Sequence, residues 1–322
     1  MKKITILAGC ILAPLALLSA GNAASQTFPQ KPVTLIVPYP PGGGSDNIAR
    51  ATANALTTKW KQPVLVENRP GADGMIATRA VTREKPDGYT LLITIPAVAA
   101  LKYINKIDGE DPLAHLKPVS LFASGPTGVV VKGGTNINSI EDFKKTCEKP
   151  DAKCSWASGE PFTLLVGTAL LEDLGLTDVV NVRYPGTSVA VNDIIGGRVT
   201  MVVTGLASIV PHHKSGTMKI LAVSTDERQA QIPEVPTYAQ AGMGAVKFVN
   251  NWYGIFAPRD TPDAVVEQIS VAMREAGKDP SVVNVLSPLM IKPVGSTPKE
   301  FQAVVKQAEQ DVARLSKHLQ SQ

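Results

Sequence analysis

The chain has 322 residues, 44% hydrophobic and 19% charged, and its 32 basic and 28 acidic side chains give a net charge of +4. This composition is typical of a globular protein, and the length allows two domains. The basic residues are scattered and form no block with interleaved aromatic residues, which argues against a nucleic-acid-binding protein.

The first predicted element is an export signal. Basic residues precede an apolar run over residues 4–20, and the small residues GNAAS then offer a cleavage site. We predict a cleaved signal peptide over residues 1–24 and a mature chain that starts near Ala24 or Ser25. An uncleaved membrane anchor is the alternative, and Pro14 argues against it. No later apolar run reaches the roughly 18 residues that a membrane span needs.

A glycine loop comes next, between the apolar run VTLIV and a helical pattern over residues 47–56. The loop, PPGGGSD, has neither the lysine of a P-loop nor the spacing of a dinucleotide-binding loop. Its glycines permit close backbone approach, and the start of the helix adds partial positive charge. The loop therefore suits a carboxylate. A tight turn without a ligand is the alternative that the residues alone leave open.

Apolar runs of strand length alternate with helical patterns along the rest of the chain. This alternation favours a parallel sheet with helices on both faces, and so many strands favour two α/β lobes. Two extended stretches, residues 120–131 and 248–258, would carry the chain between the lobes. We predict lobe 1 over 25–125 plus 249–322 and lobe 2 over 126–248, with a closing cleft between them.

Capping residues mark the starts of several predicted helices. We expect Ser45 with Asp46, Ser139, Thr261 and Thr297 to act in this way. Asp46 then reads as a capping residue rather than as a catalytic base.

The cysteines and histidines favour a disulfide over a metal site. Cys147 and Cys154 flank the turn-like segment EKPDAK, and in an oxidising compartment such a pair forms a disulfide. No histidine has the spacing of a metal site, so we expect no metal and no cofactor. His212 and His213 are expected to face solvent in a polar turn.

Two later loops have the same layout as the glycine loop. They are SGEPFT over 158–163 and YPGTS over 184–188, and each brings small or hydroxylated residues to a helix start. Three such loops from two lobes would converge on one cleft, which indicates binding. No nucleophile elbow surrounds Ser45, and no pair of acids has catalytic spacing, so we expect no enzyme.

The chain resembles the substrate-binding receptors of tripartite tricarboxylate transporters, also called Bug receptors. The resemblance covers nearly the whole mature chain, in the order VPYPPGGGSDNIAR, VENRPGADG, KPDGYTLLI, RYPGTSVAVNDIIGGRV and WYGIFAPRDTP. It implies a periplasmic protein with a two-lobed, Venus-flytrap, type II-like binding-protein fold and a ligand cleft between the lobes. Such a receptor, expected as a monomer, delivers a small organic acid to membrane permease subunits. The alternatives are a sensory receptor that presents the same acid to a membrane histidine kinase, or an exported hydrolase.

The resemblance also implies a ligand site in which the first loop holds a carboxylate through backbone groups and ordered waters. The first lobe would supply Tyr39, Pro40, Pro41, Gly42, Gly43, Gly44, Ser45, Asp46, Thr94 and Ile95. The second lobe would supply Ser158, Gly159, Gly186, Thr187, Ser188, Thr204 and Gly205.

The sequence departs from the family pattern in the second lobe. Glu160 and Phe162 stand where members commonly have small polar residues, and Pro185 and Thr200 are also unusual. In the cleft, Glu160 would repel a second carboxylate or pair with an amine, and Phe162 would stack on a ring. A solvent-facing Glu160 and a core Phe162 are the alternatives. We expect a mono- or dicarboxylate ligand, with aromatic or amino-bearing monocarboxylates favoured over a tricarboxylate such as citrate.

Overall fold

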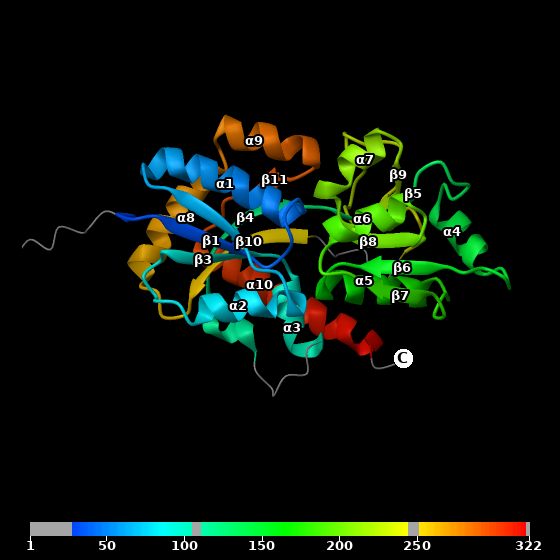
Figure 1. Ribbon diagram of the computed structural model, residues 1–322, viewed down its shortest axis with the longest axis horizontal. Coiled ribbons are helices and arrows are strands. Elements are labelled where there is room, and N and C mark those ends of the chain that lie inside the picture. Colours follow the sequence, from blue (N-terminus) through cyan, green and yellow to red (C-terminus); the bar gives the residue numbers. More distant parts are fainter. Residues whose placement is uncertain (1–27, 105–110, 244–250, 320–322) are drawn as a thin grey trace, which may run out of the picture.

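The computed structural model describes residues 28–104, 111–243 and 251–319, which form two β-sheets with helices packed around them (Figure 1). This is the mixed α/β, two-lobed arrangement that the sequence predicts. The predicted signal peptide and its cleavage site lie outside the described residues. Among the helices that are described, none is both long and apolar enough to cross a membrane.

The first sheet has six strands in the order β11-β4-β10-β3-β1-β2. Its strands are β1 (Val33–Val37), β2 (Val64–Asn68), β3 (Thr90–Thr94), β4 (Leu116–Gly125), β10 (Asn251–Pro258) and β11 (Lys292–Pro293). Its helices are α1 (Gly44–Trp60), α2 (Met75–Thr82), α3 (Ala97–Ile104), α8 (Asp263–Ala276), α9 (Pro280–Leu286) and α10 (Pro298–Leu315). In Figure 1, α1 and α9 lie above this sheet, and α2, α3 and α10 lie below it.

The second sheet has five strands in the order β7-β6-β8-β5-β9. Its strands are β5 (Thr127–Lys132), β6 (Ser155–Ser158), β7 (Val180–Arg183), β8 (Met201–Gly205) and β9 (Met218–Val223). Its helices are α4 (Ile140–Cys147), α5 (Pro161–Asp173), α6 (Thr187–Ile195) and α7 (Val210–Lys214). Five short 3₁₀ helices complete the described chain: η1 (Ala72–Gly74), η2 (Pro112–His115), η3 (Leu206–Ser208), η4 (Ser287–Leu289) and η5 (Ser316–Leu319).

The sheets are mixed, which corrects the expectation of parallel sheets. β1 pairs in parallel with β2 and β3, but β10 runs antiparallel to β3 and β4. In the second sheet, β6 pairs in parallel with β7 and β8, whereas β5 runs antiparallel to β8 and β9. The reason is connectivity: the two reversed strands, β5 and β10, each follow a strand of the other sheet, so no crossover helix within one sheet sets their direction.

Disulfide pairing agrees with the sequence prediction. Cys147 at the end of α4 is bonded to Cys154, just before β6, with an S–S distance of 2.05 Å. The two cysteines are seven positions apart in the sequence, so this bond closes a small loop at the edge of the second lobe.

Two of the four predicted helix caps are confirmed. The side chain of Ser139 accepts a hydrogen bond from Asp142 N, and Thr297 forms a reciprocal capping box with Glu300. Helix α8 instead follows Pro262, and the Thr261 hydroxyl donates to Pro258 O. Helix α1 begins at Gly44, before the residues expected to cap it, and Gly43 is its N-cap.

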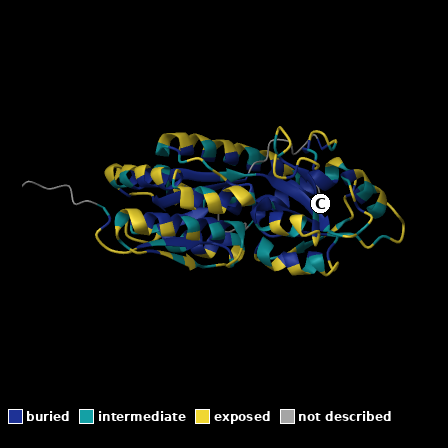
Figure 2. Cartoon of the chain, turned by 90° about the horizontal axis from the view of Figure 1, so that it is seen from above, coloured by how far each residue is buried: buried dark blue, intermediate teal, exposed yellow. Residues whose placement is uncertain are grey.

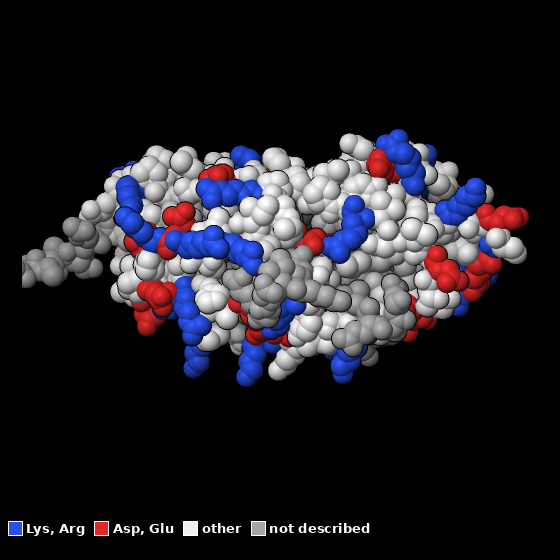
Figure 3. Space-filling view, turned by 60° about the horizontal axis from the view of Figure 1, so that its bottom comes forward, with Lys and Arg blue, Asp and Glu red and all other residues white. Residues whose placement is uncertain are grey.

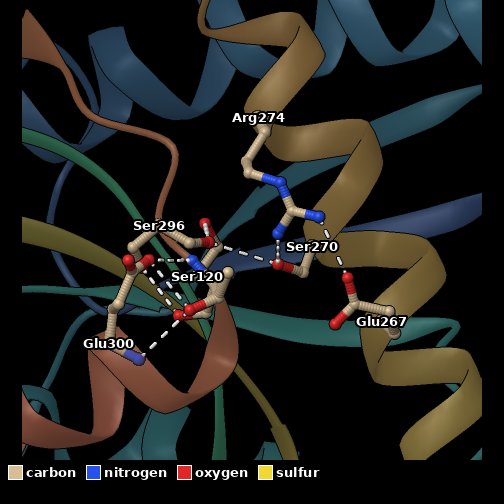
Figure 4. Close-up of polar contacts among 7 residues, drawn as sticks. Ser120, Glu267, Ser270, Arg274, Ser296 and Glu300 are labelled. Carbon is tan, nitrogen blue, oxygen red and sulfur yellow. Dashed lines mark hydrogen bonds and ion pairs between the residues drawn. The ribbon is translucent and has the colours of Figure 1, made fainter.

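A buried serine cluster fixes the start of α10 against the first sheet (Figure 4). Ser120 Oγ on β4 donates to Ser296 O at 2.9 Å, and Ser296 Oγ accepts from Leu121 N at 2.9 Å. Ser270 Oγ on α8 also donates to Ser296 O, and Arg274 donates to Ser270 Oγ. These bonds hold α10 under β10, the strand that carries two residues of the site described below.

The interior is continuous between the lobes, and Figure 2 shows buried strands enclosed by helices whose outer faces are exposed. Helix α5 of the second lobe packs against α3, α10 and η5. Its residues from Pro161 to Leu171 are all buried. On the face shown in Figure 3, acidic and basic side chains are interspersed over both lobes.

Candidate functional site

A pocket lies between the two sheets, where loops that follow strands from both lobes meet. Its volume is about 40 Å³. The first lobe contributes Tyr39, Pro40, Gly43, Gly44, Ser45, Ile95, Asn251 and Tyr253. The second lobe contributes Glu160, Gly186, Thr187, Ser188, Thr204, Gly205 and Ser208. None of these lining residues is a lysine, arginine or histidine.

Three helices begin at this pocket. Gly43 is the N-cap of α1, Glu160 that of α5, and Gly186 that of α6, and none of the three makes a side-chain capping bond. The first N–H groups of a helix have no partner within it, and the helix dipole makes that end partly positive. Three such ends, from both lobes, favour a negatively charged group in the pocket.

Glycines allow the loops of this pocket to approach one another closely. A Cβ at Gly44 would lie 2.9 Å from the Tyr253 hydroxyl, and a Cβ at Gly186 would lie 2.9 Å from Pro40 Cδ. Both distances are too short for a side chain, so only glycine permits these contacts. The second contact joins the two lobes.

Asp46 supports the glycine loop and does not line the pocket. Its carboxylate accepts hydrogen bonds from Gly42 N at 3.0 Å, Arg50 Nε at 3.1 Å and Asn68 Nδ2 at 3.0 Å. Burial works against its ionised form, but the bonds from Arg50, Gly42 and Asn68 outweigh burial and hold the pKa of Asp46 below its ordinary value. Asp46 thus fastens the loop from within the first helical turn, and the expectation of an N-cap at Ser45–Asp46 is corrected.

Glu160 is the acidic residue that faces the pocket. Its side chain is buried, with only 7% of the residue exposed. Burial raises its pKa to about 7, and hydrogen bonds with Thr187 and Thr163 oppose that rise in part. The expected alternative of a solvent-facing Glu160 is therefore wrong, because the N-cap of α5 lies inside the contact between the lobes.

Two tyrosine hydroxyls stand near Glu160. Burial and the charge of Glu160 raise the pKa of both Tyr39 and Tyr253, so both hydroxyls stay protonated. Tyr39 has a side-chain hydrogen bond with Thr94, and Tyr253 accepts one from Asn251 Nδ2 at 3.1 Å. Within the described part of the chain, the buried oxygen Asn251 Oδ1 has no hydrogen-bond partner.

The structure brings together most of the residues that the resemblance implied. Around the pocket lie Tyr39, Pro40, Gly43, Gly44, Ser45, Ile95, Glu160, Gly186, Thr187, Ser188, Thr204 and Gly205. The remaining predicted residues do not line it: Pro41, Gly42, Asp46, Thr94, Ser158, Gly159 and Phe162.

Each of these exceptions has a physical reason. Pro41 and Gly42 lie exposed on the outer side of the turn. Ser158 Oγ donates to Asn181 Oδ1 at 3.2 Å on the neighbouring strand. A Cβ at Gly159 would lie 2.7 Å from Thr187 N, so this glycine packs against the next loop.

Phe162 belongs to the core, which overturns its expected role in stacking on a ligand ring. It is 4% exposed and lies in the first turn of α5. Helix α5 is covered by α3, α10 and η5 of the first lobe, so an apolar side chain on it is buried by packing.

Sequence reasoning missed three lining residues, Ser208, Asn251 and Tyr253. Asn251 and Tyr253 are alternate residues at the start of β10, so their side chains point to the same face of the sheet. In the sequence, the stretch that contains them indicates only a crossing between the lobes. A strand that follows such a crossing starts beside the cleft, so its first residues could have been predicted to line the pocket.

The histidines do not gather with acidic side chains into a metal-binding cluster in the described part of the chain. His213 Nε2 lies 3.0 Å from Glu234 Oε1 and its side chain is only 12% exposed, so the expectation that it faces solvent is wrong. The turn is a short helix, α7, that turns this side chain toward β9, where its Nδ1 accepts from Ile220 N. Over the described ranges, no three His, Cys, Asp or Glu side chains cluster as metal ligands would.

The chain is similar to known proteins in both sequence and structure. A sequence model for the "Tripartite tricarboxylate transporter family receptor" matches residues 48–321. A "UPF0065 protein in tcbD-tcbE intergenic region" from Pseudomonas sp. strain P51 is 33% identical over 91% of this chain and 88% of that protein. "Protein BugT" from Bordetella pertussis is 29% identical over 89% of this chain and 88% of its own length.

Two solved structures from Rhodopseudomonas palustris share the fold and contain a bound acid. Rpa4515 with adipate has a TM-score of 0.84 and 26% identity, and the match covers 90% of this chain and 98% of that one. MatC (Rpa3494) with bound malate has a TM-score of 0.81 and 25% identity, and the match covers 90% and 99% of the two chains.

Proposed function

Because the chain belongs to the tripartite tricarboxylate transporter receptor family, we propose that it captures a small organic carboxylate and delivers it to the membrane permease subunits of such a transporter. Members of this family are solute receptors rather than enzymes. We place the receptor in the periplasm as a monomer, exported by a signal peptide over residues 1–24 that is then removed.

The observation that carries this proposal is the convergence of three helix starts on one buried pocket. Among the described residues, no basic side chain lines the pocket, so a carboxylate would be held by backbone N–H groups of α1 and α6 and by hydroxyl groups around them. Gly43, Gly44 and Ser45 would receive it from one lobe, and Thr187 with Ser188 from the other.

Malate and adipate, the acids bound to the two R. palustris proteins, support a small carboxylate as the ligand, which would be a mono- or dicarboxylate. Aromatic and amino-bearing acids belong to the same class. Citrate fits less well, because each further carboxylate would lie near the carboxyl group of Glu160.

We propose that the ligand closes two lobes that move as units, one over 25–125 plus 249–322 and the other over 126–248. The sheets support this division, since the first takes its strands from both ends of the chain and the second from its middle. Pro126 would be one crossing point, because β4 ends before it and β5 starts after it.

A thermal-shift panel tests the function. Ligand that binds only the folded state raises the Tm by mass action. We expect carboxylates of this size to raise the Tm by several degrees at about 100 times their Kd, and the matched primary amides to leave it unchanged. Failure of every carboxylate, together with no acid released from the purified protein in mass spectrometry, would contradict the proposal.

Delivery needs a separate measurement. Uptake of the bound acid into membrane vesicles that contain the permease should depend on this receptor. Capture without uptake, accompanied by activation of a membrane histidine kinase, would favour the sensory alternative.

A further inference from the structure

Asn251, a residue that lines the pocket, carries a buried hydrogen-bond acceptor. Asn251 is 5% exposed, and its Nδ2 donates to the Tyr253 hydroxyl. The backbone of Gly205 lies against this amide, since a Cβ there would sit 2.7 Å from Nδ2. Its Oδ1 has no partner among the described residues. A buried acceptor left unpaired is costly, so a ligand group that donates a hydrogen bond would be favoured here.

A second acceptor comes from the opposite lobe. Glu160 lines the same pocket, and its charge acts on the hydroxyls of both Tyr39 and Tyr253. No lysine, arginine or histidine is present among the described lining residues to neutralise it. Hydrogen bonds with Thr187 and Thr163 satisfy part of this buried carboxyl group, and a cationic donor would favour its ionised form further. The residues around the pocket therefore include two hydrogen-bond acceptors, Glu160 and Asn251, in addition to the three helix starts.

We infer that the ligand carries an ammonium group beside its carboxylate, and that Glu160 and Asn251 select it by binding this group. This inference rests on the proposed function, because it assigns the second end of the same ligand. An ammonium group has three N–H donors and a positive charge, which matches two acceptors of which one is acidic. A hydroxyl group has one donor and no charge. A second carboxylate has no donor when ionised and would meet Glu160 with like charge.

Phe162 supports the amino-bearing class over the aromatic class. Its ring is part of the core, so it offers no stacking surface in the pocket. Of the residues named above as departures from the family pattern, Glu160 alone lines the pocket, and it is polar.

Isothermal titration with matched sets of acids tests the inference. Each set keeps the carboxylate and changes one group from ammonium to hydroxyl to carboxylate. The short set is alanine, lactate and methylmalonate, the middle set is 4-aminobutanoate, 4-hydroxybutanoate and glutarate, and the long set is 6-aminohexanoate, 6-hydroxyhexanoate and pimelate. In the set that fits, we expect the amino acid to bind about tenfold or more tightly than both of its partners.

Variants show whether the two named acceptors cause the preference. Glu160→Gln keeps the size of the side chain but removes its charge, and should reduce the preference for ammonium about tenfold or more. Asn251→Ala should reduce it as well, because it removes Oδ1. Glu84→Gln, at an exposed glutamate outside the pocket, is the matched control and should keep the preference of the natural chain.

The outcomes separate the two proposals. If no acid in any set binds, the proposed function fails. If acids bind but a hydroxy acid or a dicarboxylate binds most tightly, the function stands and the inference is overturned. That ranking is measured on the unmodified protein, so it decides even if a variant fails to fold. An unchanged ammonium preference in a folded Glu160→Gln variant would also overturn the inference.

Discussion

Glu160 is the residue whose behaviour depends most on its surroundings. In sequence it is one acid among 28 acidic side chains, but in the fold it caps α5 inside the pocket and is 7% exposed. Burial raises its pKa to about 7, from an ordinary value of 4.5. The tyrosine hydroxyls beside it stay protonated and add no charge.

This pKa predicts how stability changes with pH. A carboxyl group whose pKa is raised by folding stabilises the protein fully below pH 4.5, and that contribution is lost as pH rises through 7. Glu160→Gln has no such loss. We therefore expect the variant to gain about 2–3 kcal/mol in free energy of unfolding relative to the natural chain between pH 5 and pH 8. Urea denaturation of ligand-free protein at both pH values measures it.

The control for this prediction is Glu84→Gln. Its free energy of unfolding should differ from that of the natural chain by the same amount at pH 5 and at pH 8. If Glu160→Gln changes the free energy of unfolding equally at both pH values, the prediction is wrong. The Glu160 carboxyl group would then titrate as it does in the unfolded chain.

At the scale of elements, β10 is the strand that links the core to the site. Its first residues, Asn251 and Tyr253, line the pocket, and the next residue, Gly254, lies directly over Phe301 of α10. A register shift in the pairing with β4 falls between Tyr253 and Gly254. The position of Tyr253 therefore depends on how closely α10 packs under the strand.

We predict that Gly254→Ala destabilises the protein by about 1–3 kcal/mol. The added Cβ would lie 2.0 Å from Phe301 Cζ. The Phe301 ring is fully buried between Trp252 and Phe256, with ring centroids 5.4 and 4.9 Å away, so it has little room to move. Urea denaturation gives the loss in free energy of unfolding.

Two variants check that this cost comes from overpacking. Gly277→Ala, where the nearest atom would be an ordinary 3.4 Å away, should have little effect. Adding Phe301→Leu to Gly254→Ala should cost less than the sum of the two single changes, because the smaller side chain relieves the contact. Additive costs would rule out the direct contact as the cause.

In the whole molecule, the two lobes are in contact at several places. Arg183 of the second lobe pairs with Asp73 of the first at 2.6 Å, and His318 near the end of the described chain contacts Glu172 on α5. Pro40 lies against Gly186 from the opposite lobe. The pocket of about 40 Å³ has room for roughly three water-sized groups. The proposed separation of the lobes would give a larger organic acid room to enter and leave.

We predict that Gly186→Ala holds the lobes apart. The new Cβ would meet Pro40 Cδ at 2.9 Å, and the proline ring cannot rotate out of the way. Small-angle X-ray scattering of ligand-free protein should show a larger radius of gyration, while the free energy of unfolding changes by less than about 1 kcal/mol.

Gly277→Ala, far from the contact between the lobes, should keep the radius of gyration of the natural chain. The same radius of gyration in Gly186→Ala would mean that the loop gives way locally and that this contact does not control closure.

Features that depend on neighbouring residues were predictable from the amino-acid sequence alone. A strand, three glycines and a helix follow one another directly, so the first loop and its helix start were predictable. The same holds for the disulfide, whose cysteines are seven positions apart, and for the caps at Ser139 and Thr297. The family resemblance then predicted the two-lobed fold and most of the residues around the pocket.

Which of the candidate side chains face the pocket could be learned only from the three-dimensional fold. Glu160 and Phe162 are two residues apart, yet one lines the pocket and the other is buried under the first lobe. Likewise, Tyr253 meets Gly44 only because β10 returns beside β3, antiparallel to it. Such orientations depend on packing between segments far apart in the chain, and local sequence patterns carry little information about that packing.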